Sequence, residues 1–447
     1  MTERKMIAAG VALLFISGAL GMEGLFSFVF LVLSAWVIVR GSIWYLNSSL
    51  RFERQQRERL LTALGNTGIF GPDGPLPVVI KTDADRQLGH VRIQVKLPSA
   101  SLVSVADLVK YDERIADALG VGRLRITRAK PGVAEFSYIV EGGMAAAPLL
   151  HAGGPVGTPS VYIGTTYDGQ PLFWRPDSDA AHILVQGASG GGKSTFLRSM
   201  FANLAPLNMA SGGLELSLVD FKGSLTGEFR HLVGVPGSLV AATASRPTEI
   251  VAEVRRLSAE LHRRRNLTEE NFGVEWGSIR EQGIDDGKRI ILVVDEFSSL
   301  LEAATHGIDD PKEAKAVAKE VTDFVTLLAQ VGRSMWIHGI FSLQRADISG
   351  SAMTGNARSN MAGRVLLPGA SIDSSAWDFS FSGDEQPSPY QGGRGLGFVS
   401  GVAHADGRAT NGVEDLVVGW SPDINKHAET VLRTGQYPAG MLTGVVR

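Results

Sequence analysis

A glycine-rich octapeptide between two structured-looking segments could bind the phosphates of a nucleotide. Residues 187–194 read GASGGGKS, which fits the phosphate-loop spacing G-x-x-x-x-G-K-S. The apolar residues 181–186 before it predict a buried strand, and residues 195–200 after it predict a helix. Glycines let backbone N–H groups curve around phosphates, and a helix N-terminus adds its positive dipole end. A plain glycine-rich turn is the alternative, but the spacing and both flanks favour phosphate binding.

The residue types in this loop indicate separate tasks in binding ATP and Mg²⁺. We expect the Lys193 ammonium to reach the β- and γ-phosphates, and the Ser194 hydroxyl to bind Mg²⁺. The full set of expected ATP-binding residues is Gly187, Ala188, Ser189, Gly190, Gly191, Gly192, Lys193, Ser194 and Thr195.

Two carboxylates follow an apolar run about 100 residues further along the chain. Residues 290–294 read IILVV and lead directly into Asp295 and Glu296, which is typical of a central parallel strand that ends in acids. Asp295 would help to hold Mg²⁺, and Glu296 would orient and deprotonate the attacking water. Such a pair alone can be a strand that ends at a turn, but after a phosphate loop it indicates a hydrolytic site.

Three further polar clusters have less specific patterns. The strand predicted over 214–219 ends at Asp220-Phe221-Lys222-Gly223, for which an ordinary charged strand end and a structural role near the nucleotide are equally good interpretations. The strand predicted over 335–343 ends at Gln344, which could sense the γ-phosphate or could be a solvated terminus. The basic triplet 263–265 fits a solvated helix face better than a DNA-binding patch.

The periodicity of the remaining chain predicts the elements that position these residues. A charged helix over 50–67 is broken by the Gly- and Pro-rich stretch 68–77. A small αβ module over 68–142 would contain strands near 91–97, 123–129 and 134–140, with an amphipathic helix over 104–120. A linker over 143–160 would then lead to an α/β motor over 161–447, with a helix opening at Asp310-Pro311 and ending at Gly332.

The first part of the chain predicts membrane insertion. Between Met6 and Val39, Glu23 is the only ionisable residue, and one helix of this length would be about 50 Å long against a bilayer core of about 30 Å. We therefore expect a helical hairpin within 1–49, with both ends and the motor on the cytoplasmic side because basic residues flank it. A cleaved signal peptide is the alternative, but a second apolar run follows at once.

Composition excludes several classes of protein. The 447 residues include no cysteine, which excludes a disulfide framework, a thiol nucleophile and an iron–sulfur cluster. The 53 glycines show no G-X-Y period, which excludes collagen. The net charge of −3 neither favours nor opposes nucleic-acid binding.

Taken together, the motifs resemble the FtsK/SpoIIIE family of membrane-anchored DNA-translocating ATPases. The resemblance extends from about residue 90 to about residue 400. It rests on the segment DERIADALGVGRLRITRAKPGVAEF (112–136), the approach to the phosphate loop (163–194), the Val294–Phe297 acidic motif, the stretch from Arg333 to Arg345, and residues 359–364.

The resemblance implies a RecA-like P-loop motor that acts as a homo-hexameric ring around double-stranded DNA, with ATP between subunits. Arg333 matches the arginine that the family presents to the γ-phosphate of a neighbouring subunit, and Gln344 matches the sensor position. The stretch from Arg345 to Arg358 matches a region that faces the pore, which makes these two arginines the expected DNA contacts.

The sequence also departs from the family pattern. Phe221 and Trp336 stand where the family usually has Pro and Gly, and Ser371 stands where it often has a second cationic residue. About 50 residues follow Gly397, so we expect no winged-helix domain there. This compact layout is more similar to conjugative-transfer ATPases of Gram-positive plasmids and integrated elements. The alternative is a type VII-like protein-secretion motor, and transfer or secretion machinery would be the further partner.

Overall fold

The computed structural model describes residues 49–438, with gaps at 72–73, 86–89, 100–102, 122–123, 141–148, 151–157, 167–168, 345–352, 370, 383, 385, 387–394 and 411. The chain divides into two compact units, Met1–Met144 and Ala145–Arg447. The predicted membrane hairpin lies outside the described residues except for its last one. Within the described ranges, no helix combines the length and the apolar character that crossing a membrane requires.

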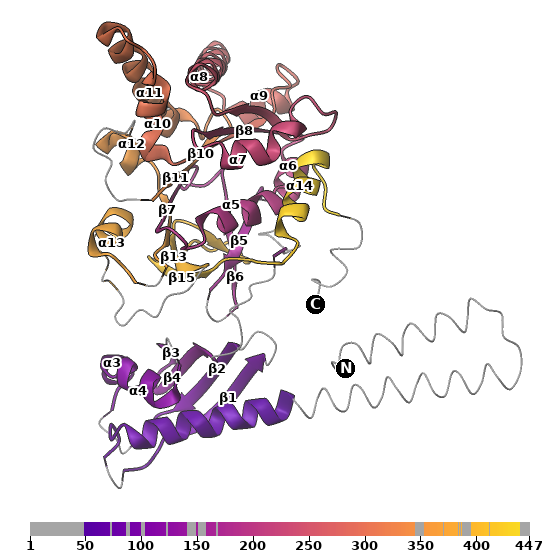
Figure 1. Ribbon diagram of the computed structural model, residues 1–447. Coiled ribbons are helices and arrows are strands. Elements are labelled where there is room, and N and C mark those ends of the chain that lie inside the picture. Colours follow the sequence, from indigo (N-terminus) through magenta and orange to yellow (C-terminus); the bar gives the residue numbers. More distant parts are fainter. Residues whose placement is uncertain are drawn as a thin grey trace, which may run out of the picture. The chain divides into compact units, whose positions relative to one another are not determined.

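The first unit contains an antiparallel sheet with helices on one face (Figure 1). Its strands have the order β1 (Val78–Asp85), β2 (His90–Lys96), β4 (Val133–Ile139) and β3 (Leu124–Lys130). Alternate side chains such as Val91, Ile93 and Val95 are buried under the helices, as expected for a sheet with one covered face.

The helix over 49–66 shares this core rather than standing apart from it. Leu60 and Leu64 are fully buried in the same apolar cluster as Ile93 of β2. The predicted helix over 104–120 is two helices, α3 (Val105–Lys110) and α4 (Asp112–Leu119), because Tyr111 between them leaves the helical region with φ −112° and ψ 15°. The break changes the direction of the chain and lets both short helices reach the core.

The second unit is built on a large mixed sheet. In the described part of this unit the strand order is β14-β6-β5-β15-β13-β12-β7-β11-β10-β8-β9. The six strands from β12 to β9 are parallel, and the other five join them in antiparallel pairs. The parallel strands are β12 (Gly363–Leu367), β7 (Ile183–Gly187), β11 (Ile337–Leu343), β10 (Arg289–Asp295), β8 (Leu214–Asp220) and β9 (Val240–Ala244). The antiparallel strands are β14 (Ala403–His404), β6 (Pro171–Trp174), β5 (Val161–Thr165), β15 (Glu414–Val417) and β13 (Leu396–Ser400).

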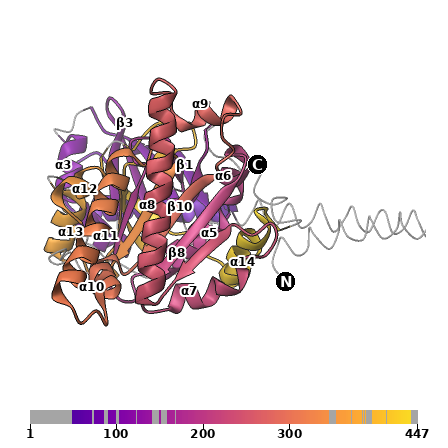
Figure 2. The same cartoon turned by 90° about the horizontal axis from the view of Figure 1, so that it is seen from above.

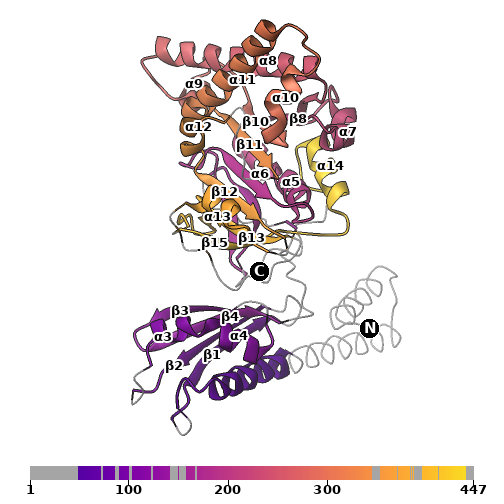
Figure 3. The same ribbon diagram turned by 60° about the vertical axis from the view of Figure 1, so that its left-hand side comes forward.

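Helices cover both faces of the parallel block, which explains why its strands are continuous apolar runs. On one face, Ile291 and Val293 of β10 share a core with α5 (Lys193–Ala202), α6 (Ala205–Ala210) and α14 (Ile424–Thr434), and α14 packs beside α5 (Figure 3). On the other face, Ile290 and Leu292 share a core with α8 (Pro247–Glu270), α10 (Leu300–Thr305) and α11 (Pro311–Val331), which pack against one another (Figure 2).

The remaining helices are short and lie near the strand ends. They are α7 (Ser224–Phe229), α9 (Trp276–Glu281), α12 (Gly355–Ser359) and α13 (Ser374–Phe381). The unit is thus a mixed α/β fold in which β7, β11, β10 and β8 all end at the same edge of the sheet, because these neighbours are parallel.

Candidate nucleotide-binding site

The phosphate loop connects β7 to α5, as predicted. The Gly191 N–H donates to the Ala188 carbonyl at 2.9 Å, and Gly190 and Gly192 have φ angles of 81° and 106°. A Cβ at Gly191 would lie 2.3 Å from the Leu367 carbonyl oxygen of β12, so only glycine allows this approach of the two backbones. The loop is therefore a backbone cradle of the kind that binds phosphate oxygens.

Lys193 points from the start of α5 toward the acids at the end of β10. Its Nζ lies 3.4 Å from Asp295 Oδ1 and 3.7 Å from Glu296 Oε2, and its side chain is only 9% exposed. Among the described residues this ammonium has no hydrogen-bond partner. Because a buried ammonium needs acceptors, this orphaned donor group fits a site that receives phosphate oxygens.

The residues expected to hold Mg²⁺ fit that role. Ser194 lies exposed in the first turn of α5, and Asp295 ends β10 beside Lys193. Asp295 Oδ1 accepts hydrogen bonds from the Ser342 hydroxyl and from the Glu296 N–H. Within the described residues no group of three or more His, Cys, Asp or Glu residues gathers as an all-protein metal site. Mg²⁺ in nucleotide sites is usually held by one or two protein oxygens together with phosphates and water, which matches this donor set.

Glu296 is held in an unusual backbone conformation with both carboxylate oxygens engaged. Its φ is +58°, a left-handed value that is uncommon for a residue with a side chain. Oε2 accepts a hydrogen bond from Lys222 Nζ at 2.8 Å, and Oε1 accepts one from the Ser298 hydroxyl at 3.0 Å. Burial raises the Glu296 pKa, but the hydrogen bond from Lys222 and the charge of Lys193 outweigh it, so the net pKa lies below its usual value.

Two residues at this edge were not assigned roles from the sequence alone. Lys222 reaches Glu296 because β8 and β10 are neighbours in register, with Asp220 opposite Asp295. Ser342 of β11 donates to Asp295 and is fully buried. A serine one residue before the end of a mostly apolar strand was the signal for Ser342, and the Asp-Phe-Lys-Gly strand end was the signal for Lys222.

The two residues expected to respond to the γ-phosphate lie at opposite ends of β11. Gln344 follows the strand at the edge that carries the phosphate loop. Arg333 precedes the strand, and its Nη1 donates to Asp179 Oδ1 at 2.7 Å. Because a seven-residue strand is about 20 Å long, Arg333 lies too far from Lys193 to serve the site of its own chain.

The expected DNA contacts are only partly described. Arg345 lies outside the described residues. The Arg358 guanidinium donates to the Phe379 carbonyl at 2.6 Å and lies 4.3 Å from the centre of the Phe379 ring. Arg358 is therefore anchored on α13, and its contact with DNA stays a prediction.

The basic triplet of α8 is not a uniform solvated face. Arg263 pairs with Glu260 and Asp285, and Arg265 pairs with Glu269. Arg264 between them is 1% exposed and donates to the carbonyls of Met335 and Lys288. The interpretation as a surface helix face thus holds for Arg263 and Arg265, and it is wrong for Arg264, whose carbonyl partners satisfy a buried cation.

Over part of its length the chain is similar to known proteins. Residues 160–331 match the FtsK/SpoIIIE family. The chain is 24% identical over 282 residues to a DNA translocase FtsK from Halalkalibacterium halodurans, covering 59% of this chain and 33% of that protein. It is 25% identical over 299 residues to a DNA translocase FtsK from Lactiplantibacillus plantarum, covering 63% of this chain and 35% of that protein. The match thus spans about a third of the length of these curated relatives.

A solved structure shares the fold over most of the chain. The pCW3 conjugation coupling protein TcpA, solved as a monomer form with ATPγS, is 19% identical, and the match covers 84% of this chain and 99% of that one with a TM-score of 0.52. At this identity the likeness concerns the fold. Residues 160–331, the part that matches the FtsK/SpoIIIE family, contain the phosphate loop and the acidic strand end.

Proposed function

We propose that this chain is a membrane-anchored ATPase that moves double-stranded DNA, and that it serves the transfer of a conjugative plasmid or element. The observation that carries the proposal is the meeting of Lys193, Asp295 and Glu296 at one sheet edge, with Lys193 Nζ within 3.7 Å of both carboxylates. The FtsK relatives are named DNA translocases, and the fold is shared with a conjugation coupling protein.

In this proposal each residue at the edge has a defined task in ATP hydrolysis. Lys193 and the loop amides bind the phosphates, and Glu296 accepts the proton of the attacking water. Ser194 and Asp295 would hold Mg²⁺, which neutralises the charge that develops on the phosphate oxygens. Ser342 fixes the Asp295 carboxylate by its hydrogen bond, so that it is oriented before ATP arrives.

A homo-hexamer completes the site in this proposal. Arg333 cannot reach the phosphate loop of its own chain across the length of β11, but it can be presented to the loop of a neighbouring subunit. The ion pair of Arg333 with Asp179 is a surface pair, 49% and 99% exposed, so that exchanging it for a phosphate costs little. Gln344 would sense the γ-phosphate from the other end of the same strand.

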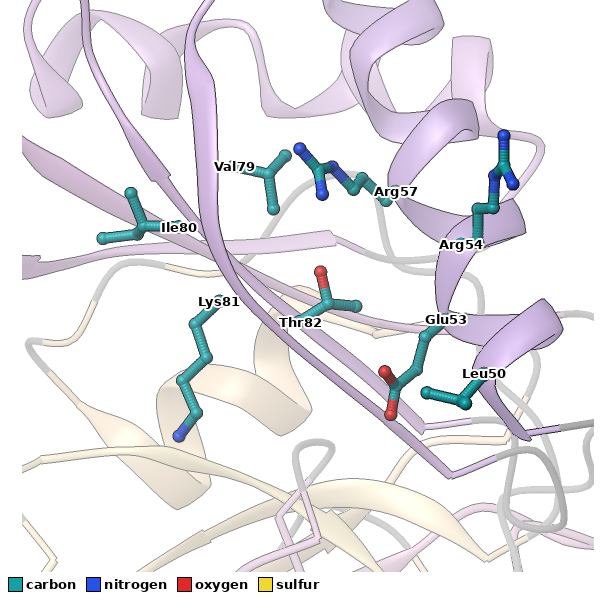
Figure 4. Close-up of a pocket in the computed structure, with 8 residues that line it drawn as sticks. All are labelled: Leu50, Glu53, Arg54, Arg57, Val79, Ile80, Lys81 and Thr82. Atoms are coloured by element: carbon teal, nitrogen blue, oxygen red, sulfur yellow. The ribbon is translucent and has the colours of Figure 1, made fainter. Parts of the chain in front are cut away.

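The surface near residue 49 supports the proposed membrane anchor. A cavity of about 380 Å³ lies between the helix over 49–66 and β1, and Figure 4 shows Arg57 extending toward Val79 while Arg54 points away from β1. Leu50 at this cavity is 61% exposed, although it is apolar. Exposed apolar side chains beside arginines suit the headgroup region of a bilayer, and the apolar stretch 6–39 precedes them in the sequence.

In this proposal DNA binds to local cationic residues, because the chain as a whole is slightly acidic. Arg345 and Arg358 are the proposed contacts, and they would bind backbone phosphates with little sequence preference. The proposal therefore includes a steep dependence of DNA binding on salt.

The test is the ATPase activity of the full-length chain in lipid nanodiscs, with and without duplex DNA, at 50 and 200 mM salt. The proposal expects DNA to stimulate hydrolysis, more at the lower salt concentration, and Lys193→Ala to abolish it. Lys426→Ala, which changes an exposed lysine of α14, is the matched control. Robust ATPase activity that no duplex stimulates would refute the DNA proposal, and stimulation by secreted helical proteins instead would indicate a protein-secretion motor.

A further inference from the structure

A rigid turn presents Lys222 to the candidate general base. The Asp220 carboxylate, which is fully buried, accepts hydrogen bonds from the Lys222 N–H at 2.9 Å, the Ser224 hydroxyl at 3.1 Å and the Leu225 N–H at 2.7 Å. Gly223, with a φ of 76°, lets the chain turn immediately after Lys222. The backbone on both sides of Lys222 is thereby fixed, although its side chain remains 54% exposed.

The Lys222 ammonium donates a hydrogen bond to a carboxylate oxygen with which Glu296 could accept the proton of water. Lys222 Nζ lies 2.8 Å from Glu296 Oε2, whereas Lys193 Nζ lies 3.7 Å from the same atom. Ser298 donates to Oε1, so both oxygens of Glu296 already accept hydrogen bonds from protein groups. A carboxylate bonded to an ammonium is a weaker base, and the ammonium competes with water for the same lone pairs.

ATP binding would affect the two lysines at Glu296 differently. Lys193 is nine-tenths buried at the phosphate loop, so that phosphates would draw it away from the acids. Lys222 lies on the other side of β10, on the turn after β8, and no contact links it to the loop among the described residues. ATP therefore gives Lys222 no reason to leave Glu296, so its contact persists when nucleotide binds.

We infer that Lys222 is a positioning residue that restrains Glu296 and so keeps the basal rate of ATP hydrolysis low. This inference rests on the proposed ATP hydrolysis at the same site, and it adds a control on the general base. The opposite arrangement, in which Lys222 orients Glu296 for productive attack, predicts the opposite change when the lysine is removed.

The test is Lys222→Met in the full-length chain, assayed for ATP turnover without DNA at pH 8. Loss of a partly exposed ion pair should raise kcat about two- to fivefold with KM for ATP unchanged. Lys222→Arg should keep the low basal rate, because it keeps the cation.

Two measurements make the result decisive. Lys426→Met is the matched control, and it should leave kcat and KM unchanged. Binding of a fluorescent ATP analogue and the melting temperature establish that Lys222→Met is folded and binds nucleotide. A basal kcat that stays equal or falls in folded, nucleotide-binding Lys222→Met would overturn the inference. If wild type hydrolyses ATP without DNA stimulation while Lys222→Met is faster, the DNA proposal fails and the restraint of Glu296 stands.

Discussion

Arg333 and Asp179 form an ion pair, with Nη1 2.7 Å from Oδ1, at the sheet edge opposite to the phosphate loop. The pair links the turn before β11 to the segment between β6 and β7. Asp179 is 99% exposed, so the guanidinium is held at the surface rather than buried in its own subunit. A cation in this position can act on ATP only if another subunit brings its phosphate loop to it.

Arg333→Ala should therefore abolish hydrolysis while each subunit keeps its own ATP-binding residues. We expect kcat to fall by roughly 10³-fold, the effect of removing an arginine that stabilises charge in trans. Mixing Arg333→Ala with inactive Lys193→Ala should restore part of the activity, because some mixed interfaces combine an intact Lys193 with an intact Arg333. The measurement is the ATPase rate of the mixture against its mixing ratio.

Arg265→Ala is the control for this experiment, because it removes another exposed, ion-paired arginine from α8 of the same unit. It should change the rate little. Mixtures of Arg333→Ala and Lys193→Ala that remain inactive at every ratio, with both chains assembled, would contradict the shared site.

Glu296→Gln should separate ATP binding from hydrolysis. The amide keeps the size of the side chain but cannot accept the proton of water, so we expect kcat to fall by about 10²-fold or more with nucleotide affinity retained. Retained turnover in Glu296→Gln would assign the base to another group. The measurements are steady-state turnover and equilibrium binding of a fluorescent ATP analogue.

The same residue determines how activity responds to acid. Interaction with Lys222 and Lys193 lowers the Glu296 pKa below its ordinary value near 4.5 despite burial. The carboxylate is thus ionised throughout the neutral range, and its contribution to stability and to catalysis is lost only as the pH falls through the lowered pKa. We expect no loss of kcat from Glu296 between pH 6 and pH 8, and an acid limb below pH 5 is the observation to seek.

Local sequence patterns predicted the central part of the site but not the contacts across it. The spacing around Lys193 and the apolar run before Asp295 are local features, and β7, α5 and β10 appear where those features indicated. The contact between Lys222 and Glu296 joins residues 74 positions apart, and it depends on β8 pairing with β10 in one register. No local periodicity encodes which parallel strands become neighbours.

Local sequence patterns also did not predict which charged residues are buried. Arg264 stands between two exposed arginines, and only the tertiary structure places the Met335 and Lys288 carbonyls where its guanidinium needs them. The break between α3 and α4 at Tyr111 is similar, because the amphipathic pattern over 104–120 continues through it. In both cases the structure depends on packing against distant elements, which the local sequence pattern does not contain.

Asp220→Ala should destabilise the second unit. The substitution leaves the buried Leu225 N–H and the partly buried Lys222 N–H without their acceptor, and a hydrogen bond to a charged group contributes about 1.5–3 kcal/mol. We expect a loss of about 2 kcal/mol or more, measured as a lower urea midpoint by tryptophan fluorescence. Asp309→Ala at an exposed position is the control and should unfold at the wild-type midpoint. An unchanged midpoint for Asp220→Ala would show that water replaces the carboxylate.

Gly191→Ala should remove ATP binding without unfolding the chain. The new Cβ would lie 2.3 Å from the Leu367 carbonyl oxygen and 3.1 Å from that of Ala188, and neither backbone atom can move without displacing β12 or the loop. Displacement of the loop takes its N–H groups away from the phosphates, so we expect at least a tenfold loss of affinity for a fluorescent ATP analogue. The matched control is Gly227→Ala in α7, where a Cβ meets nothing within 4 Å and the helix should gain about 0.5–1 kcal/mol. Equal affinity in the two variants would mean that the close approach of Gly191 to β12 does not shape the phosphate site.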